Sequence, residues 1–287
     1  MERTEILKKY WQSILEQRIG GNPPAWVLNK KQLHEKRGSN VPRVRGEGRI
    51  FNSSPIDGGK VRVNYDLTVT FFVKQGHSFY HEEENRKHTA LIQKGEVIHD
   101  EPIVQEYQPA DLPVIEVKGL ENMREARFGY DRRAAVRYAE RWWNDYNPAY
   151  TELTVDCTNF VSQCLHAGGA PMRGAPDKGS GWWYQNGSWS FSWAVAHSLR
   201  WYLSGSAQGL KGTEVERPDD LSPGDVICYD FQGDGRWDHN TIVVSKDTEG
   251  MPLVNAHTDN SRHRYWSYED SMAWTENCQY KFFRIGE

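Results

Sequence analysis

Residues 154–169 read TVDCTNFVSQCLHAGG, and this stretch decides how the second half of the chain is interpreted. Asp156 suits the N-cap of a helix over 158–167, because Gly168-Gly169 then provides the C-terminal stop. Cys157 would lie in the first turn, where unpaired N–H groups and the helix dipole favour a thiolate. We therefore expect a lowered pKa for the Cys157 thiol, as in catalytic cysteines. The alternative is a small buried hydrophobic residue, the commoner role of a free cysteine.

Polar residues on two later strands are positioned to complete a catalytic site. His239 stands at the start of a predicted strand, from which an imidazole can reach a helix N-terminus. Asn255 and His257 share one face of the next strand, because side chains alternate along a strand. Either residue could hold His239 in the correct tautomer, which is the role of the third member of a triad. The alternative for each histidine is an ordinary surface or core position, since the chain contains 10 of them.

The N-terminal part of the chain combines a helix with β-rich sequence. Apolar residues at helical spacing predict a helix over 4–19, and residues 41–117 are β-rich, with a hairpin around 88–99. A helix followed by antiparallel strands is an α+β pattern. The segment loosely resembles small cone-shaped domains of the nuclear-transport-factor-two-like type.

Pro109, Pro113 and Gly119 mark a linker, so we expect a smaller domain at 1–119 and a second domain at 120–287. In the second domain, helices are expected after Asp131, over 158–167 and over 193–203, and strands over 225–231, 240–245, 253–257 and 279–285.

The order of these motifs resembles the bacterial putative amidase domain family. The resemblance is carried by DCTNFVSQ at 156–163, AGG at 167–169, GDG at 233–235 and DH at 238–239. It covers about residues 130–285, and the family is similar to papain-like cell-wall hydrolases of the NlpC and CHAP types. The resemblance implies an α+β, papain-like cysteine hydrolase domain, in which a helix-borne cysteine packs on an antiparallel sheet.

The same resemblance implies a thiol-dependent amidase or endopeptidase. Cys157 would be the nucleophile and His239 the base, and the third residue maps to His257, with Asn255 as the alternative. The substrate would be a peptide or an amide linkage, for example in peptidoglycan, and no metal or cofactor is needed. Two other functions stay open, namely a catalytically inactive glycan- or peptide-binding protein on the same fold and an acyltransferase that uses the same cysteine.

Four residues are candidates for binding the substrate. Trp182 and Trp183 begin an aromatic segment that ends at Trp193, and neighbouring glycines lead us to expect both side chains to be exposed. Their faces and N–H groups would suit a glycan or a peptide, whereas most of the segment is expected to be core. Asp156 and Asp238 directly precede Cys157 and His239 and complete the set.

Composition excludes several other classes. The formal net charge of −4 argues against a nucleic-acid binder, and no apolar run approaches the length of a membrane helix. The N-terminus has no signal-peptide pattern, so we expect a cytoplasmic protein unless a leader has been removed. The four cysteines include no Cys-x-x-Cys pair, which argues against structural zinc. Residues 230–241 lack the closing acidic ligand of a calcium loop, so a Gly-rich hairpin loop is favoured.

Overall fold

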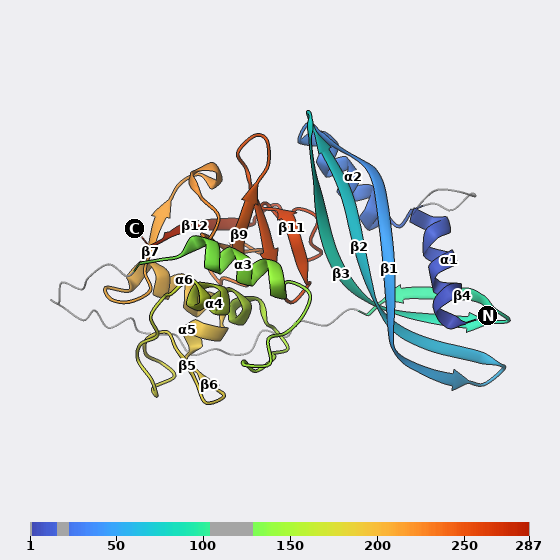
Figure 1. The fold of residues 1–287 in the computed structure, drawn as a ribbon, viewed down its shortest axis with the longest axis horizontal. Helices are drawn as coiled ribbons and strands as arrows, with labels where there is room; N and C mark the ends of the chain where they lie inside the picture. Colours follow the sequence, from blue (N-terminus) through green and yellow to red (C-terminus); the bar gives the residue numbers. More distant parts are fainter. Residues whose placement is uncertain (1, 16–22, 104–128, 287) are drawn as a thin grey trace. The chain divides into compact units, whose positions relative to one another are not determined.

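The computed structural model describes residues 2–15, 23–103 and 129–286. Contacts divide the chain into two compact units, residues 1–110 and 111–287 (Figure 1). The predicted linker, with Pro109, Pro113 and Gly119, and the predicted boundary at residue 119 lie outside the described residues.

Unit 1 contains two helices followed by a meander of four antiparallel strands in the order β1-β2-β3-β4. The elements are α1 (Arg3–Leu15), α2 (Ala25–Lys36), β1 (Ser39–Ile56), β2 (Lys60–Gln75), β3 (Ser78–Gln93) and β4 (Glu96–Pro102). The predicted helix over 4–19 is confirmed as far as Leu15, and its remainder lies outside the described residues. The predicted hairpin is formed by β3 and β4. Helix α2 was not predicted, because its apolar residues are too few to form a clear stripe.

The core of unit 1 follows the two periodicities of its sequence. Alternate residues of β2, from Val63 to Val73, are buried, while α1 buries one stripe that includes Trp11. The indole Nε1 of Trp11 donates a hydrogen bond to the Tyr65 hydroxyl at 2.8 Å, which ties α1 to the sheet. The likeness to nuclear-transport-factor-two-like domains stays a prediction.

Unit 2 packs helices on an antiparallel sheet of six strands in the order β11-β10-β9-β8-β12-β7 (Figure 1). The helices are α3 (Arg132–Trp142), α4 (Cys157–Ala167), α5 (Phe191–Ala194), α6 (Ala196–Gly205) and the 3-10 turn Pro218–Asp220. The sheet strands are β7 (Gly212–Val215), β8 (Val226–Asp230), β9 (His239–Lys246), β10 (Pro252–Ala256), β11 (Ser261–Tyr265) and β12 (Gln279–Ile285), and β5 (Tyr184–Gln185) pairs with β6 (Ser188–Trp189) in a separate hairpin.

The predicted strands of this unit are present, as are the helices after Asp131 and over 158–167. The helix predicted over 193–203 is instead two helices, α5 and α6, separated by the extended residue Val195. The Asp131 carboxylate caps α3 by accepting a hydrogen bond from the Ala134 N–H at 2.9 Å. Strands β7 and β11 were not predicted, because both are short and β11 reads SRHRY, which lacks an apolar alternation. The unit is therefore a mixed α and β structure with a large antiparallel sheet.

Both faces of this sheet are covered. On one face Cys228 and Ile242 pack against helix residues that include Phe160 and Cys164. On the other face Tyr229 packs in a second cluster, to which Tyr268 and other aromatic residues of the segment after β11 belong. Strands β8 and β10 are accordingly buried along their whole length. The position of a residue along β9 thus decides whether its side chain meets the helices or the aromatic cover.

Candidate active site

The N-terminus of α4 lies where the sequence predicts, with Cys157 as the first helical residue and Asp156 at the N-cap. The Asp156 carboxylate is not bonded to the helix N–H groups. It accepts hydrogen bonds from the Leu153 N–H at 3.1 Å, the Asn159 amide at 2.8 Å and His257 Nδ1 at 2.7 Å. Asp156 is almost fully buried, so its role is to hold the residues around α4 and not to bind a substrate.

Both ring nitrogens of His257 have acceptor partners. Nδ1 faces Asp156, and Nε2 lies 2.7 Å from the carbonyl oxygen of Trp142. Both ring nitrogens are therefore engaged by oxygen atoms of other residues. The ring also stacks on Phe160, with centroids 4.0 Å apart. His257 therefore has no nitrogen left for His239, and this geometry does not support the predicted orienting role.

The alternative third residue, Asn255, is occupied as well. Its amide Nδ2 donates to the Ala139 carbonyl at 3.3 Å and to the Glu140 carboxylate at 3.0 Å. Its Oδ1 accepts a hydrogen bond from the His263 N–H at 2.9 Å. Asn255 therefore joins β10 to α3 and β11, and neither predicted third residue is hydrogen-bonded to His239.

Burial raises the pKa of the Cys157 thiol. Three hydrogen bonds oppose this rise, from the Asn240 backbone N–H and from the Thr158 and Thr258 hydroxyls, whereas the negative charge of Asp156 adds to it. The Thr158 oxygen lies 3.7 Å from the sulfur. The expectation of a lowered pKa is therefore wrong for this arrangement, because the loss of solvent outweighs the donors at the helix N-terminus.

His239 lies at the start of β9, directly before Asn240, whose N–H faces the Cys157 sulfur. Its ring lies among aromatic side chains, 5.6 Å from Tyr229 and 5.1 Å from Tyr268 between centroids. Its Nε2 is buried and has no hydrogen-bond partner. Burial, helped by the positive charge of Arg264, lowers the pKa of His239 to about 3. The imidazole is therefore neutral, which is the form that can accept a proton.

The sequence-predicted nucleophile and base are thus neighbours without a hydrogen bond between them in the described structure. Alternation along β9 explains this arrangement. Asn240 points toward α4, where its amide donates to the Thr158 hydroxyl at 3.0 Å, whereas His239 pairs with Tyr229 on the face of the aromatic cover.

The expectation that Trp182 and Trp183 are exposed is wrong. Trp182 is fully buried and Trp183 nearly so, and the Trp182 indole donates to the Ser162 hydroxyl at 2.9 Å. Gly181 allows two segments of the chain to pack closely, because a Cβ at this position would lie 2.0 Å from the Arg173 carbonyl oxygen. The alternative interpretation, in which the aromatic segment supplies the core, is confirmed for these two residues.

Asp238 differs from the other predicted binding residues in being only half-buried. Its carboxylate accepts a hydrogen bond from the Phe231 N–H at 3.1 Å, and burial raises its pKa to about 6. In the same loop, the Asp230 carboxylate accepts hydrogen bonds from the N–H groups of Gly233 at 2.8 Å and Gly235 at 2.7 Å. The loop is thus closed by its own hydrogen bonds. No group of three or more His, Cys, Asp or Glu side chains among residues 2–15, 23–103 and 129–286 could hold a metal ion.

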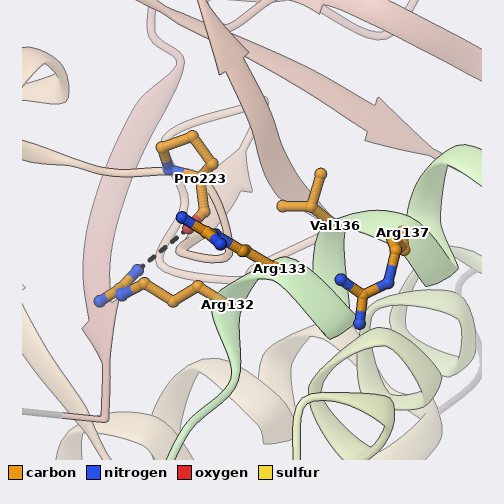
Figure 2. A pocket seen from close by; sticks show the side chains of 5 residues that line it. All are labelled: Arg132, Arg133, Val136, Arg137 and Pro223. Carbon is orange, nitrogen blue, oxygen red and sulfur yellow. Dashed lines mark hydrogen bonds between the residues drawn. The ribbon is translucent and has the colours of Figure 1, made fainter.

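The pocket in Figure 2 lies away from the thiol. It is lined by Arg132, Arg133, Val136, Arg137 and Pro223, and Arg132 donates to the Pro223 carbonyl at 3.2 Å. The start of α3 meets the end of α4, because the Asp131 N–H donates to the Gly168 carbonyl at 2.8 Å. Cys157 is at the other end of that helix, roughly 16 Å away. This pocket is therefore separate from the candidate site.

Sequence reasoning missed the residues that surround the sulfur. Thr258 follows His257 and Asn240 follows His239, so both polar neighbours stand next to residues that the motifs singled out. Their contact with Cys157 depends on how the start of β9 and the end of β10 pack against α4, which no local sequence pattern predicts.

Comparison with known proteins agrees with the position of these motifs. The sequence profile of a family described as "Putative amidase domain" matches residues 129–283. The uncharacterized protein YhbB of Bacillus subtilis (strain 168) is 47% identical over 264 residues, which cover 89% of this chain and 84% of YhbB. This alignment is longer than either unit and so includes residues of both.

A second relative matches a smaller part. The uncharacterized protein YjcM of the same organism is 32% identical over 141 residues, 46% of this chain and 32% of YjcM. No solved structure matches. Within the part of the chain that the structure describes, we find no helix with the length and apolar character needed to span a membrane.

Proposed function

Because the chain belongs to the putative amidase domain family, we propose that unit 2 is a thiol-dependent amidohydrolase on a papain-like fold. Cys157 is the nucleophile and His239 the general base. The observation that carries this proposal is the pair of neighbours at the end of α4. Cys157 begins the helix, and its sulfur meets the backbone N–H of Asn240, the residue after His239.

In the proposed reaction, His239 takes the proton from the Cys157 thiol as the sulfur attacks the amide carbonyl carbon. The carbonyl oxygen becomes an oxyanion, and backbone N–H groups near Cys157 stabilise it, other than the Cys157 N–H, which donates to the Thr258 hydroxyl. The carbon–nitrogen bond then breaks, and the protonated His239 returns its proton to the leaving amine. Water, deprotonated by His239, hydrolyses the thioester and regenerates the thiol.

We infer that the buried arrangement is a closed resting state of this site. Cys157 and His239 are both buried, and each is favoured in its neutral form. A substrate must therefore enter together with a rearrangement that brings the imidazole to the sulfur. Formation of the thiolate–imidazolium pair would accompany substrate binding, because the charged pair is costly in a dry site until the two groups meet.

We propose a peptide or an amide linkage as the substrate, with peptidoglycan fragments as the first class to examine. The full-length protein and Cys157→Ala are each incubated with peptidoglycan fragments, short peptides and simple amides, and the products are identified by mass spectrometry. Release of a free amine by the wild type alone supports the proposal. Equal cleavage by both proteins, or cleavage of none of the three classes, contradicts it.

A non-catalytic binding protein on the same fold is the second candidate. The missing hydrogen bond between Cys157 and His239, together with the burial of both, favours it. This function predicts that Cys157→Ala binds peptidoglycan fragments as tightly as the wild type does and that neither protein changes them.

A further inference from the structure

The strongest unexplained feature of the site is Thr258, the residue directly after His257. Its backbone φ is +81°, in the left-handed region that a β-branched residue adopts rarely and at a cost. Such strain persists only where surrounding contacts enforce it. At Thr258 the contacts are two hydrogen bonds to its hydroxyl, from the Asp156 N–H at 3.2 Å and from the Cys157 N–H at 3.2 Å.

These two bonds fix the direction of the hydroxyl proton. A hydroxyl group has two lone pairs and one proton, and here both lone pairs accept backbone N–H groups from the start of α4. The hydroxyl proton is left for another acceptor, and the Cys157 sulfur is close enough for the Thr258 hydroxyl to oppose the rise in the pKa of the thiol. The hydroxyl thus lies between two N–H groups at the N-terminus of α4, which it accepts, and the thiol.

We propose that Thr258 is a positioning residue for the nucleophile, which directs its hydroxyl proton at the Cys157 sulfur and so stabilises the thiolate. This inference rests on the proposed function of the same site, because only a thiol that must ionise needs such a donor. The strained backbone is the means of placing the hydroxyl there. Thr258 is also exposed, so it lies between the buried sulfur and solvent.

Other groups around the thiol do not replace this donor. The Asp156 carboxylate opposes ionisation of the thiol and is paired with His257, and His239 carries no hydrogen bond to the sulfur. Cys228 contributes a second buried thiol from β8. The Thr158 hydroxyl lies 3.7 Å from the sulfur and also accepts a hydrogen bond from the Asn240 amide.

The test is an NMR pH titration of isotope-labelled cysteine in the full-length protein, with the Cys157 signal assigned by its loss in Cys157→Ser. Thr258→Val keeps the shape and the strain but removes the hydroxyl. We expect its Cys157 titration midpoint to rise by roughly one pH unit, the size of a hydrogen bond to a charged group. Thr258→Ser keeps the hydroxyl and should titrate like the wild type.

A second variant separates this role from a merely structural one. Thr258→Gly removes the hydroxyl and relieves the left-handed strain, so its thermal midpoint should not fall below that of Thr258→Val. Its Cys157 midpoint should nevertheless rise as in Thr258→Val. Thr241→Val is the matched control, because the Thr241 hydroxyl faces Tyr229 at 3.1 Å, and it should leave the midpoint unchanged.

An unchanged Cys157 midpoint in both Thr258→Val and Thr258→Gly overturns the inference, as does an equal rise in Thr241→Val. The readout needs no turnover. A shifted midpoint without any amide cleavage would therefore retain Thr258 and reject the proposed function, and a wild-type midpoint with Cys157-dependent cleavage would do the reverse.

Discussion

Unit 1 and unit 2 each bury a polar cluster, and the two clusters differ in how completely they are paired. In unit 1, Lys30 of α2 forms ion pairs with Glu82 and Glu84 of β3, the latter at 3.3 Å. His34 lies 3.1 Å from the second Glu82 oxygen and 3.1 Å from the Ser39 hydroxyl. All of these charges are paired, so the cluster holds α2 on the sheet.

In unit 2, the cluster around Cys157 leaves polar groups without strong partners. His239 Nε2 is buried without a hydrogen bond, and the sulfur is surrounded by neutral donors. Buried polar groups are normally paired, so an unpaired one calls for an explanation, and reactive sites are a frequent one. We propose that the unpaired imidazole beside Cys157 reflects the chemistry proposed for this site. Lack of a partner alone does not identify a reactive group, because His88 Nε2 in unit 1 is also buried without a hydrogen bond.

Replacing His239 should give the largest effect on turnover. If turnover did not change, the contrast between the two polar clusters would not reflect chemistry in unit 2. His239→Ala removes the proposed base, so turnover of an amide that the wild type cleaves should fall by roughly 10²–10⁴-fold. The measurement is steady-state release of the amine. Lys30→Met, in the fully paired cluster of unit 1, is the control and should keep wild-type turnover at a temperature where it is folded. A normal rate in His239→Ala would remove the histidine from the mechanism.

Lys30→Met should instead lower the free energy of unfolding. It leaves the buried Glu82 carboxylate without its lysine, whereas Glu84 keeps Arg86 at 2.7 Å. Removal of one partner from a buried ion pair costs about 3–5 kcal/mol. Urea unfolding followed by circular dichroism measures the loss. The double variant Lys30→Met/Glu82→Gln should recover part of it, because one uncompensated charge is gone. A single-variant loss below 1 kcal/mol would mean that the cluster does not hold α2.

The pair His257→Ala and Asn255→Ala sharpens the comparison within unit 2. His257→Ala leaves the buried Asp156 carboxylate without its histidine partner, so we expect a loss of about 1–3 kcal/mol in unfolding free energy. Any fall in turnover of this variant should be indirect, because it would result from a displacement of the start of α4. Asn255→Ala should affect the packing of α3 on β10 and leave turnover near normal. A fall of ~10²-fold in His257→Ala with unchanged stability would restore the predicted orienting role of this residue.

The pH dependence of stability has opposite signs for two adjacent residues. The pKa of His239 is about 3 in the folded protein, against about 6.5 when unfolded. As the pH falls between these values the unfolded chain binds the proton first. His239 therefore lowers stability by up to about 1.4 kcal/mol per pH unit. His239→Phe should flatten this loss in urea unfolding at several pH values.

Asp238 acts in the opposite sense. Its pKa is about 6 in the folded protein against 3.8 as the ordinary value, so the folded state binds the proton first and gains stability as the pH falls through this range. Asp238→Asn should remove that gain. Equal pH profiles for the wild type and both variants would show that neither group is shifted as its burial indicates.

Local patterns were sufficient for much of unit 2. The Asp131 cap of α3 and the strands that became β8, β9, β10 and β12 follow from capping and from the period of apolar residues. The start of α4 was placed correctly, although the Asp156 side chain does not cap the helix. These features depend on residues close together in the chain. The same rules gave β2 and its neighbour in unit 1, whereas α2 and β11 lack the periodic signal and were missed.

Tertiary structure alone decided the partners of the polar residues. The Thr258 hydroxyl and the Cys157 N–H are 101 residues apart, and His257 and Asp156 likewise meet only because the end of β10 lies against the start of α4. The sequence placed His257 and Asn255 on one strand face, yet it did not show that this face turns toward α3 and α4 and away from His239. Burial of Trp182 and the raised pKa of Cys157 have the same origin, because desolvation depends on what covers a side chain and not on its neighbours in the chain.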